Sequence, residues 1–206
     1  MIVINCEQGS DAWFEQRAGV PSASNFKRIV TSTGKPTSAS VQQTYMYELV
    51  AEWMGAREGG FQSEWMARGN ELEPQARAYY RFLTDNDVTE VGTVFKDARR
   101  EYSCSPDGLV GDVGGLEIKC PKASTHVKYL YANKMPAEYV AQVQGSMLVT
   151  GRKWWDFLSF HPDLEPFLIR VQRDDDYIHE LQRQLASFIE RRDEVLTQLY
   201  TQEKAA

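Results

Sequence analysis

The segment 101–122, EYSCSPDGLVGDVGGLEIKCPK, constrains the fold of this chain more than any other stretch. Two short runs rich in strand-forming residues, 102–110 and 116–120, flank the turn-rich segment 111–115, which contains three glycines. Such runs, separated by a few residues that include glycine, predict a β-hairpin with a loop or a bulge.

The hairpin would place charged side chains together on one face. Pairing that is symmetric about Val113 sets Leu109 opposite Glu117 and Asp107 opposite Lys119. Because side chains alternate between the two faces of a strand, these four residues then share a face. Asp107 and Glu117 become diagonal neighbours with α-carbons about 7–8 Å apart, so their carboxylates could hold one divalent ion.

This face would be costly to bury without partners, which indicates a metal ion in a solvent-filled cleft. Carboxylate oxygens suit Mg²⁺ or Mn²⁺, and Mg²⁺ often shares its coordination shell with a substrate phosphate. Lys119 could position a water or stabilise negative charge that develops on phosphorus. The pattern Pro106-Asp107, then Glu117-Ile118-Lys119, therefore predicts a metal-dependent site that cleaves phosphodiesters. The alternative is a solvated hairpin in which Asp107 and Lys119 form a surface ion pair.

Composition excludes several classes of protein. A chain of 206 residues, 42% hydrophobic and 25% charged, fits one globular domain spanning 1–206. It has no apolar stretch of membrane-spanning length and no secretory signal, and its three cysteines lack metal-ligand spacing, so we expect a cytoplasmic protein without an iron–sulfur cluster. There is no phosphate-binding P-loop and no G-x-S-x-G elbow, and the three histidines are scattered.

The charge of the chain is unevenly distributed. Of the net charge of −6, the segment 174–206 contributes −4 through eight acidic and four basic residues. The rest of the chain is then only −2. An acidic outer helix with basic residues gathered elsewhere is compatible with DNA binding, although this balance neither supports nor excludes it.

The order of elements predicts an α/β fold. Helices flank a run of strands in the middle of the chain, which indicates a central mixed β-sheet with helices on both sides. We expect strands at 2–4, 88–95, 102–110, 116–120, 153–160 and 166–172. We expect helices at 10–19, 38–55, 63–84 with a kink or a restart at Pro74, 124–131, 136–151 and 174–200.

Two closely spaced helix starts suggest a phosphate site near the N-terminus. Ser10 and Ser22 are each expected to cap a helix. This places Arg17 and Ser24 near exposed helix ends, where phosphate is readily bound. The alternative is that the serines only cap and that Arg17 is a surface charge.

Three further segments carry polar side chains of interest. Lys35 lies at the tip of a polar loop, 31–40. Glu73, at the predicted kink, could form a third wall of a metal site, or belong to a solvated helix face. Tyr139 and Gln142 lie on the same side of their helix, where buried polar groups need partners: a phosphate, a metal-bound water, or other core groups.

Several motifs in one order resemble the phage lambda exonuclease family of recombination nucleases. SPDG is followed by GGLEIKCP, with RGNELEPQAR upstream and AEYVAQVQGSM downstream, and SDAWFEQRAGVPSASNF is similar to the N-terminal motif of that family. The match runs from about Gln8 to Met147, and the acidic terminal helix fits as well.

The resemblance implies a restriction-endonuclease-like core within a ring-shaped homotrimer, a toroid whose channel admits duplex DNA. It implies Mg²⁺-dependent, processive 5′→3′ digestion of one strand from 5′-phosphorylated double-stranded ends, which leaves a 3′ overhang. Enclosure of DNA by the ring would give processivity without a strongly basic chain. The usual partner is a single-strand annealing protein, and the origin is a phage or prophage in a bacterial host.

The resemblance also assigns roles to residues. Asp107, Glu117 and the Ile118 carbonyl would bind Mg²⁺, Lys119 would orient or activate the attacking water, and Glu73 would complete the environment of a second ion. Two such ions lie about 3.5–4 Å apart, and Mn²⁺ is expected to substitute for Mg²⁺.

The 5′-phosphate would be held by four residues, Arg17, Ser24, Ser105 and Gln142. Tyr139 would support the site or contact DNA. Met66 stands where the family has an apolar wedge, normally leucine, between terminal base pairs. Lys35 is counted among the DNA-binding candidates, although its loop diverges from the family.

Two other functions fit the same residues. A restriction or repair endonuclease would cut circular DNA internally, but the sequence contains no obvious separate region that reads a target. A non-catalytic DNA-end binding protein would keep all its activities after Lys119→Ala.

Overall fold

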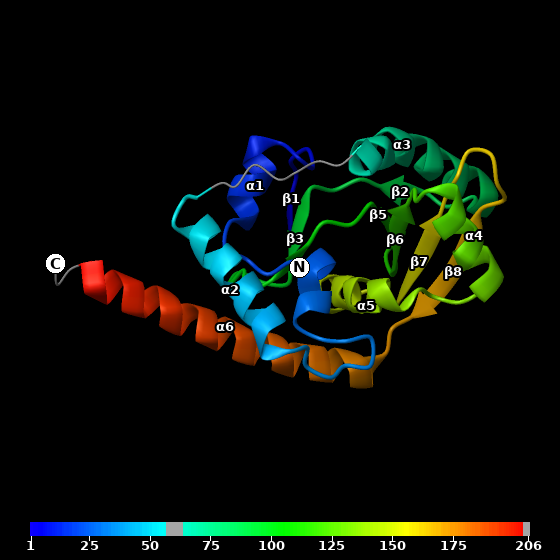
Figure 1. The fold of residues 1–206 in the computed structure, drawn as a ribbon. Helices are drawn as coiled ribbons and strands as arrows, with labels where there is room; N and C mark the ends of the chain where they lie inside the picture. The colour runs from blue at the N-terminus through cyan, green and yellow to red at the C-terminus, as the bar shows by residue number, and fades with distance from the viewer. Residues whose placement is uncertain (57–63, 204–206) are drawn as a thin grey trace.

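The structure is a computed structural model that describes the backbone of residues 1–56 and 64–203 and the side chains of 1–56 and 67–201 (Figure 1). Its elements follow one another in the order β1 (Ile2–Ile4), α1 (Asp11–Arg17), the 3₁₀ helix η1 (Ala23–Arg28), α2 (Ala39–Trp53), α3 (Glu64–Thr84), β2 (Val88–Thr89), β3 (Thr93–Phe95), β4 (Ser103–Cys104), β5 (Gly108–Val110), β6 (Gly114–Lys119), α4 (Ala123–Ala132), α5 (Ala137–Thr150), β7 (Trp154–Ser159), β8 (Phe167–Gln172) and α6 (Asp175–Glu203).

The strands of the described residues form two sheets. The larger has the order β2-β5-β6-β7-β8, and the smaller has the order β1-β3-β4. The pair β6–β7 is parallel and the other pairs are antiparallel. A parallel pair needs a long crossover, and α4 and α5 provide it. The predicted α/β fold, with a central mixed sheet flanked by helices, is confirmed. The predicted strand 88–95 is divided, because β2 joins the larger sheet and β3 the smaller.

Helices cover both faces of the larger sheet. Figure 1 shows α3 along one side of the molecule and α6 along the other, with α5 between α6 and the strands. Tyr80 of α3 packs with Leu116 and Leu158 of the sheet in one apolar cluster. A larger cluster joins residues of η1, α2, α5 and α6, among them Phe26 and Phe188. Among the described residues, no helix combines the length and the apolar character needed to cross a membrane.

The predicted hairpin is present, but its predicted register is wrong. Leu109 pairs with Gly115 rather than with Glu117. The reason is that Gly114 and Gly115 belong to the strand and not to the turn. A β-carbon on either would lie 2.1 Å from the Trp154 ring or 2.3 Å from the Trp155 ring, respectively. The glycines therefore make room for two indoles. A shift of two residues keeps each side chain on its predicted face.

One of the two expected helix caps is present, and one predicted helix face is only partly buried. Ser10 caps α1 as expected, since its Oγ accepts from the Trp13 N–H at 3.3 Å, whereas Ser22 precedes a 3₁₀ helix without a side-chain cap. The spacing of Val41, Tyr45, Leu49 and Trp53 along α2 predicts one buried stripe. Only the middle of this stripe, Tyr45 and Leu49, is buried, whereas Val41 and Trp53 are 42% and 49% exposed. Positions four residues apart drift by about 40° per step around a helix of 3.6 residues per turn, so the ends of such a stripe leave the buried face.

The close packing of α5 on η1 predicts a difference between two helical glycines. A β-carbon on Gly145 would lie 2.4 Å from the Phe26 ring, whereas one on Gly69 of α3 would have open space around it. We expect Gly145→Ala to lower the free energy of unfolding by about 1–3 kcal/mol through overpacking. Gly69→Ala should raise it by up to about 1 kcal/mol through helix propensity. Urea unfolding measures both, and equal effects would contradict the packing described.

Candidate active site

Asp107 and Glu117 lie side by side at the open end of the β5–β6 hairpin. Continuing the observed register by one step beyond Gly108 places Asp107 opposite Glu117. The backbone N–H of Ile118 donates to Oδ2 of Asp107 at 2.6 Å. The carboxylate of Asp107 is therefore directed toward β6, beside the carboxylate of Glu117. The hairpin brings together the two predicted metal ligands more directly than the predicted register did.

Glu117 is buried and held from two sides. Its side chain is only 1% exposed. Its Oε1 accepts from Nζ of Lys119 and, at 2.6 Å, from Nε2 of Gln142 on α5. The ammonium of Lys119 also lies 5.3 Å from the ring centroid of Tyr139, one turn before Gln142. The predicted alternative of a surface ion pair between Asp107 and Lys119 is not what the structure has, because the lysine pairs with the buried Glu117.

The positive charge of Lys119 does not fully compensate the negative charges of Asp107 and Glu117. Burial, together with the charge of Asp107, raises the pKa of Glu117 to about 7 in spite of Lys119. Burial also raises the pKa of Asp107. Burial alone would lower the pKa of Lys119, but Glu117 and Asp107 outweigh it, so that this pKa lies above its ordinary value.

This imbalance makes the donor set suitable for a hard divalent cation. Two adjacent carboxylates and one lysine leave an excess negative charge in a buried site, and oxygen donors are the ligands that Mg²⁺ and Mn²⁺ prefer. Within the described part of the chain, no three histidine, cysteine or acidic side chains form a ready-made metal cage. Asp107 and Glu117 thus fit as a pair, and further ligands would come from the backbone, water or substrate.

Glu73 reaches the same site from α3. Burial and the charge of Asp107 raise its pKa to about 7. Its Oε1 accepts from Arg77, whose Nη1 donates to Glu90 at 2.8 Å and whose Nε donates to the Asp107 carbonyl at 2.9 Å. The helix continues through Pro74, so α3 does not restart there.

Arg77 is a site residue that sequence reasoning missed. The solvated helix face expected as the alternative for Glu73 is not what the structure has, because its i, i+4 partner Arg77 is only 8% exposed. The available signal was its position at the end of the RGNELEPQAR motif. Spacing within a helix cannot tell a solvated pair from one that a neighbouring hairpin covers.

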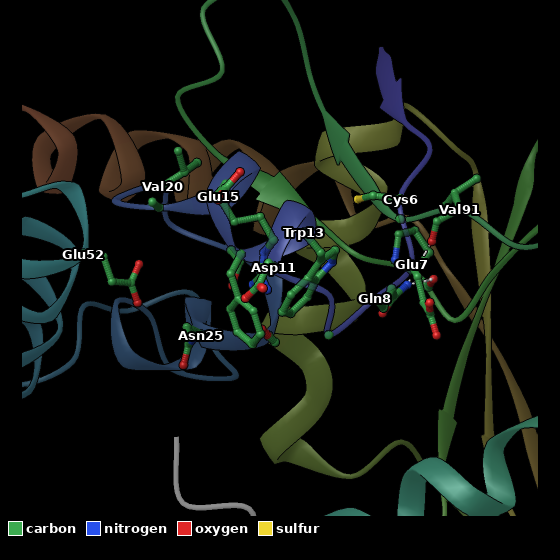
Figure 2. Close-up of a pocket in the computed structure, with 18 of the residues that line it drawn as sticks. Cys6, Glu7, Gln8, Asp11, Trp13, Glu15, Val20, Asn25, Glu52 and Val91 are labelled. Carbon is green, nitrogen blue, oxygen red and sulfur yellow. Dashed lines mark hydrogen bonds between the residues drawn. The ribbon is translucent and has the colours of Figure 1, made fainter. Parts of the chain in front are cut away.

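A broad cleft connects this site to Arg17. Its lining includes Asp107 and Glu73 at one end, and Trp13, Arg17 and Ser24 further along. Figure 2 shows the wall formed by the N-terminal segment, where Gln8, Asp11 and Trp13 come from neighbouring positions of the chain.

Arg17 is half-buried in this wall. Its guanidinium stacks on the Trp13 ring, with Cζ 3.8 Å from the ring centroid. Burial lowers the pKa of Arg17, and its Nε has no hydrogen-bond partner among the described residues. The alternative of a simple surface charge does not describe this arginine.

The other residues predicted to hold the 5′-phosphate divide between the surroundings of Arg17 and those of Glu117. Ser105 accepts from the Trp13 indole N–H at 3.0 Å, so it lies near Arg17. Ser24 lines the same cleft and pairs with the Ser22 hydroxyl at 3.1 Å. Gln142, by contrast, donates to Glu117 beside Asp107.

Of the two remaining DNA-binding candidates, Lys35 is not brought to this site. Lys35 is exposed, and the neighbouring Gly34 packs beside Glu180 of α6. Lys35 is not among the residues that line the cleft. Met66 lies in the first turn of α3, and its side chain is outside the described residues.

Comparison with known proteins agrees with this fold and site. The YqaJ-like viral recombinase domain matches residues 12–153. An alkaline exonuclease, LHK-Exo from Laribacter hongkongensis, is 36% identical, and the match covers 96% of this chain and 100% of that chain with a TM-score of 0.87. The structure of LHK-Exo in complex with dAMP gives a TM-score of 0.86 at the same identity and coverage.

A phage-related exonuclease from Haemophilus somnus 129PT shares the fold at 15% identity, with a TM-score of 0.69 and coverage of 87% of this chain and 96% of that one. A search of curated proteins gave no match. The chain belongs to the YqaJ-like viral recombinase family, and its resemblance to the lambda exonuclease family is confirmed.

The buried position of Arg77 predicts that its removal is costly. Arg77→Ala would leave Glu73 and the Asp107 carbonyl without their donor, so the free energy of unfolding should fall by about 2–4 kcal/mol. Arg81, one turn later, is 45% exposed and donates to the Val88 carbonyl, so Arg81→Ala should cost about 1 kcal/mol or less. Urea unfolding of both variants tests this, and equal losses would contradict the assignment of Arg77.

Proposed function

We propose that this chain is a Mg²⁺-dependent 5′→3′ exonuclease that digests one strand of linear duplex DNA from 5′-phosphorylated ends and leaves 3′ overhangs. Membership of the YqaJ-like viral recombinase family and similarity to alkaline exonucleases support a DNA exonuclease role in recombination. The observation that carries the proposal is the group Asp107, Glu117 and Lys119. Lys119 pairs with the buried Glu117, and Asp107 lines the cleft that also contains Arg17. The dAMP complex of LHK-Exo is consistent, because stepwise digestion releases mononucleotides.

In this proposal the chain holds each acidic group in place before substrate arrives. Asp107, Glu117 and the Ile118 carbonyl would bind Mg²⁺, and Glu73 would complete the environment of a second ion. When bound, such ions supply Lewis-acid stabilisation of the attacking and leaving oxygens, and Mn²⁺ is expected to substitute. The N–H of Ile118 orients Asp107, and Gln142 orients Glu117.

Lys119 would act as a donor rather than as a base. Its raised pKa keeps the ammonium protonated at neutral pH. A protonated lysine beside the carboxylates can orient the attacking water and stabilise negative charge that develops on phosphorus. Tyr139 keeps this ammonium over its ring face and so supports its position.

Recognition of a 5′-phosphate is proposed for Arg17 with Ser24 and Ser105. Much of the cleft is acidic, with Glu7, Asp11, Glu15, Glu48 and Glu52 in its lining. A phosphate would therefore be repelled from most of the cleft and attracted to the guanidinium of Arg17. Gln142 would contribute from beside Glu117, to which it donates.

The assembly and the partners are proposed from the family resemblance. The proposed assembly is a homotrimer that encloses DNA and so supports processive digestion. The proposed partner is a single-strand annealing protein that loads on the 3′ overhang. Both would act in the cytoplasm of a bacterial host of the phage or prophage. Light scattering tests the trimer, and a pull-down tests the annealing partner. A monomer, or the absence of binding, would refute the corresponding part.

The site predicts end-dependent digestion that requires Asp107 and Lys119. In Mg²⁺, linear duplexes with 5′-phosphates should be degraded, whereas a closed circle should stay intact. Asp107→Asn and Lys119→Met should each lower the rate by about 100-fold or more. Lys153→Met, which changes an exposed lysine at the other end of the hairpin, should not.

Gel analysis of the same digestions separates the alternatives. Internal cutting of the circle would favour an endonuclease. A wild-type protein without metal-dependent cleavage of any substrate would favour a DNA-end binding protein.

Arg17 is predicted to discriminate between 5′-phosphate and 5′-hydroxyl ends. Arg17→Met should reduce the ratio of kcat/KM for the two ends by about 10- to 100-fold, as expected for the loss of a charge-assisted contact. Arg28→Met is the matched control, because Arg28 already pairs with Glu48 at 2.7 Å. An Arg17→Met variant with unchanged discrimination would remove Arg17 from phosphate recognition.

A further inference from the structure

Three consecutive residues leading into the catalytic hairpin are each held by a distant side chain. The Trp13 indole N–H donates to Oγ of Ser105 at 3.0 Å. Nε2 of Gln8 donates to the Pro106 carbonyl at 2.9 Å, and Nε of Arg77 donates to the Asp107 carbonyl at 2.9 Å. The segment 105–107 lies between β4 and β5, so strand pairing does not position it. Side-chain donors do this instead.

Gln8 makes the most unusual of these contacts. Its Nε2 donates to two carbonyls, those of Val91 at 3.0 Å and Pro106 at 2.9 Å. A primary amide has two N–H groups, so one side chain can satisfy both acceptors. These carbonyls are 83 and 98 residues away in the sequence. Gln8 therefore joins the β2–β3 connection to the residue before Asp107.

The segment that supplies Gln8 also supplies Arg17. Trp13 lies between them in the sequence, and its ring carries the guanidinium of Arg17 on one side while its N–H reaches Ser105. Residues 8–17 therefore touch the approach to Asp107 at two points and present Arg17 to the cleft. Whatever orders this segment also restricts the backbone of Asp107.

We infer that Gln8 is a positioning residue that sets Asp107 for divalent-cation binding, from the same segment that presents Arg17 to a DNA end. This inference deepens the proposed function and rests on it. Outer partners that orient a metal ligand commonly contribute 10- to 100-fold to metal affinity or activity. Because the segment is shared, a phosphate bound at Arg17 favours the placed form of Asp107, and coupling between two binding sites is reciprocal. A 5′-phosphate therefore increases kcat and does not act on KM alone.

The test compares two isosteric changes in the same segment. Gln8→Glu keeps the shape but replaces the donor with an acceptor that faces two carbonyl oxygens. Gln16→Glu is the matched control, because Gln16 accepts from Nη1 of Arg100 at 3.1 Å and a carboxylate keeps this bond. Gln8→Met removes the donor without adding charge and replaces Gln8→Glu if that variant does not fold.

Two measurements follow, one of which is independent of activity. Calorimetric titration with Mn²⁺ should show affinity about tenfold weaker for Gln8→Glu and unchanged for Gln16→Glu. On 5′-phosphorylated duplexes, Gln8→Glu should lower kcat about tenfold with KM within about twofold of wild type. A purely structural role would change unfolding free energy without this split between kcat and KM.

The outcomes separate the inference from the proposed function. If Gln8→Glu and Gln8→Met have the same Mn²⁺ affinity and the same kcat as Gln16→Glu, the proposed role of Gln8 is overturned. A wild-type protein that binds Mn²⁺ but has no preference for 5′-phosphorylated ends would overturn end recognition, while the Mn²⁺ affinities would still decide the role of Gln8. A wild-type protein that does not bind Mn²⁺ would overturn both.

Discussion

The site depends on the placing of two adjacent carboxylates, the buried Glu117 and the half-buried Asp107, against a single lysine. Asp107 and Glu117 face each other across the hairpin, and Lys119 offsets only part of their charge. Burying charge without compensation is expensive, so the surrounding donors are a requirement of the fold as well as of the chemistry. Ile118 N–H and Gln142 donate to the two carboxylates from β6 and α5. Arg77 of α3 donates to the backbone carbonyl of Asp107, and its positive charge favours the Asp107 carboxylate. A divalent cation would complete the compensation.

Contacts at both ends of the β5–β6 hairpin hold it in the sheet. Gly114 and Gly115 let the rings of Trp154 and Trp155 lie directly over β6, which fastens the hairpin to the parallel strand β7. At its closed end, Nη1 of Arg152 donates to the carbonyls of Val110, Gly111 and Gly114. The turn is thus bonded to Arg152, two residues after the end of α5. Helix α5 therefore contacts Glu117 at one end of the hairpin through Gln142, and Arg152, just after α5, holds the turn at the other end.

Much of the fold could be predicted from local pattern, and the errors have physical causes. Helix starts such as Ser10 and strands such as β7 follow from capping and periodicity, which act over a few residues. The predicted hairpin register was wrong because glycine usually indicates a turn. Gly114 and Gly115 instead lie within a strand, where they make room for the rings of tryptophans 40 residues later in the chain. The site pair Asp107 and Glu117 could be found from spacing alone. Arg77 could not, since its role is set by a hairpin that packs on α3 from elsewhere in the chain.

The central claim is that Asp107 and Glu117 together hold a divalent cation, and anomalous scattering from crystals grown with Mn²⁺ tests it most directly. The account predicts a manganese peak contacted by both carboxylates, lost in crystals of Glu117→Gln that retain the same fold. Manganese bound elsewhere in an active enzyme, or a peak that persists unchanged in Glu117→Gln, would contradict it.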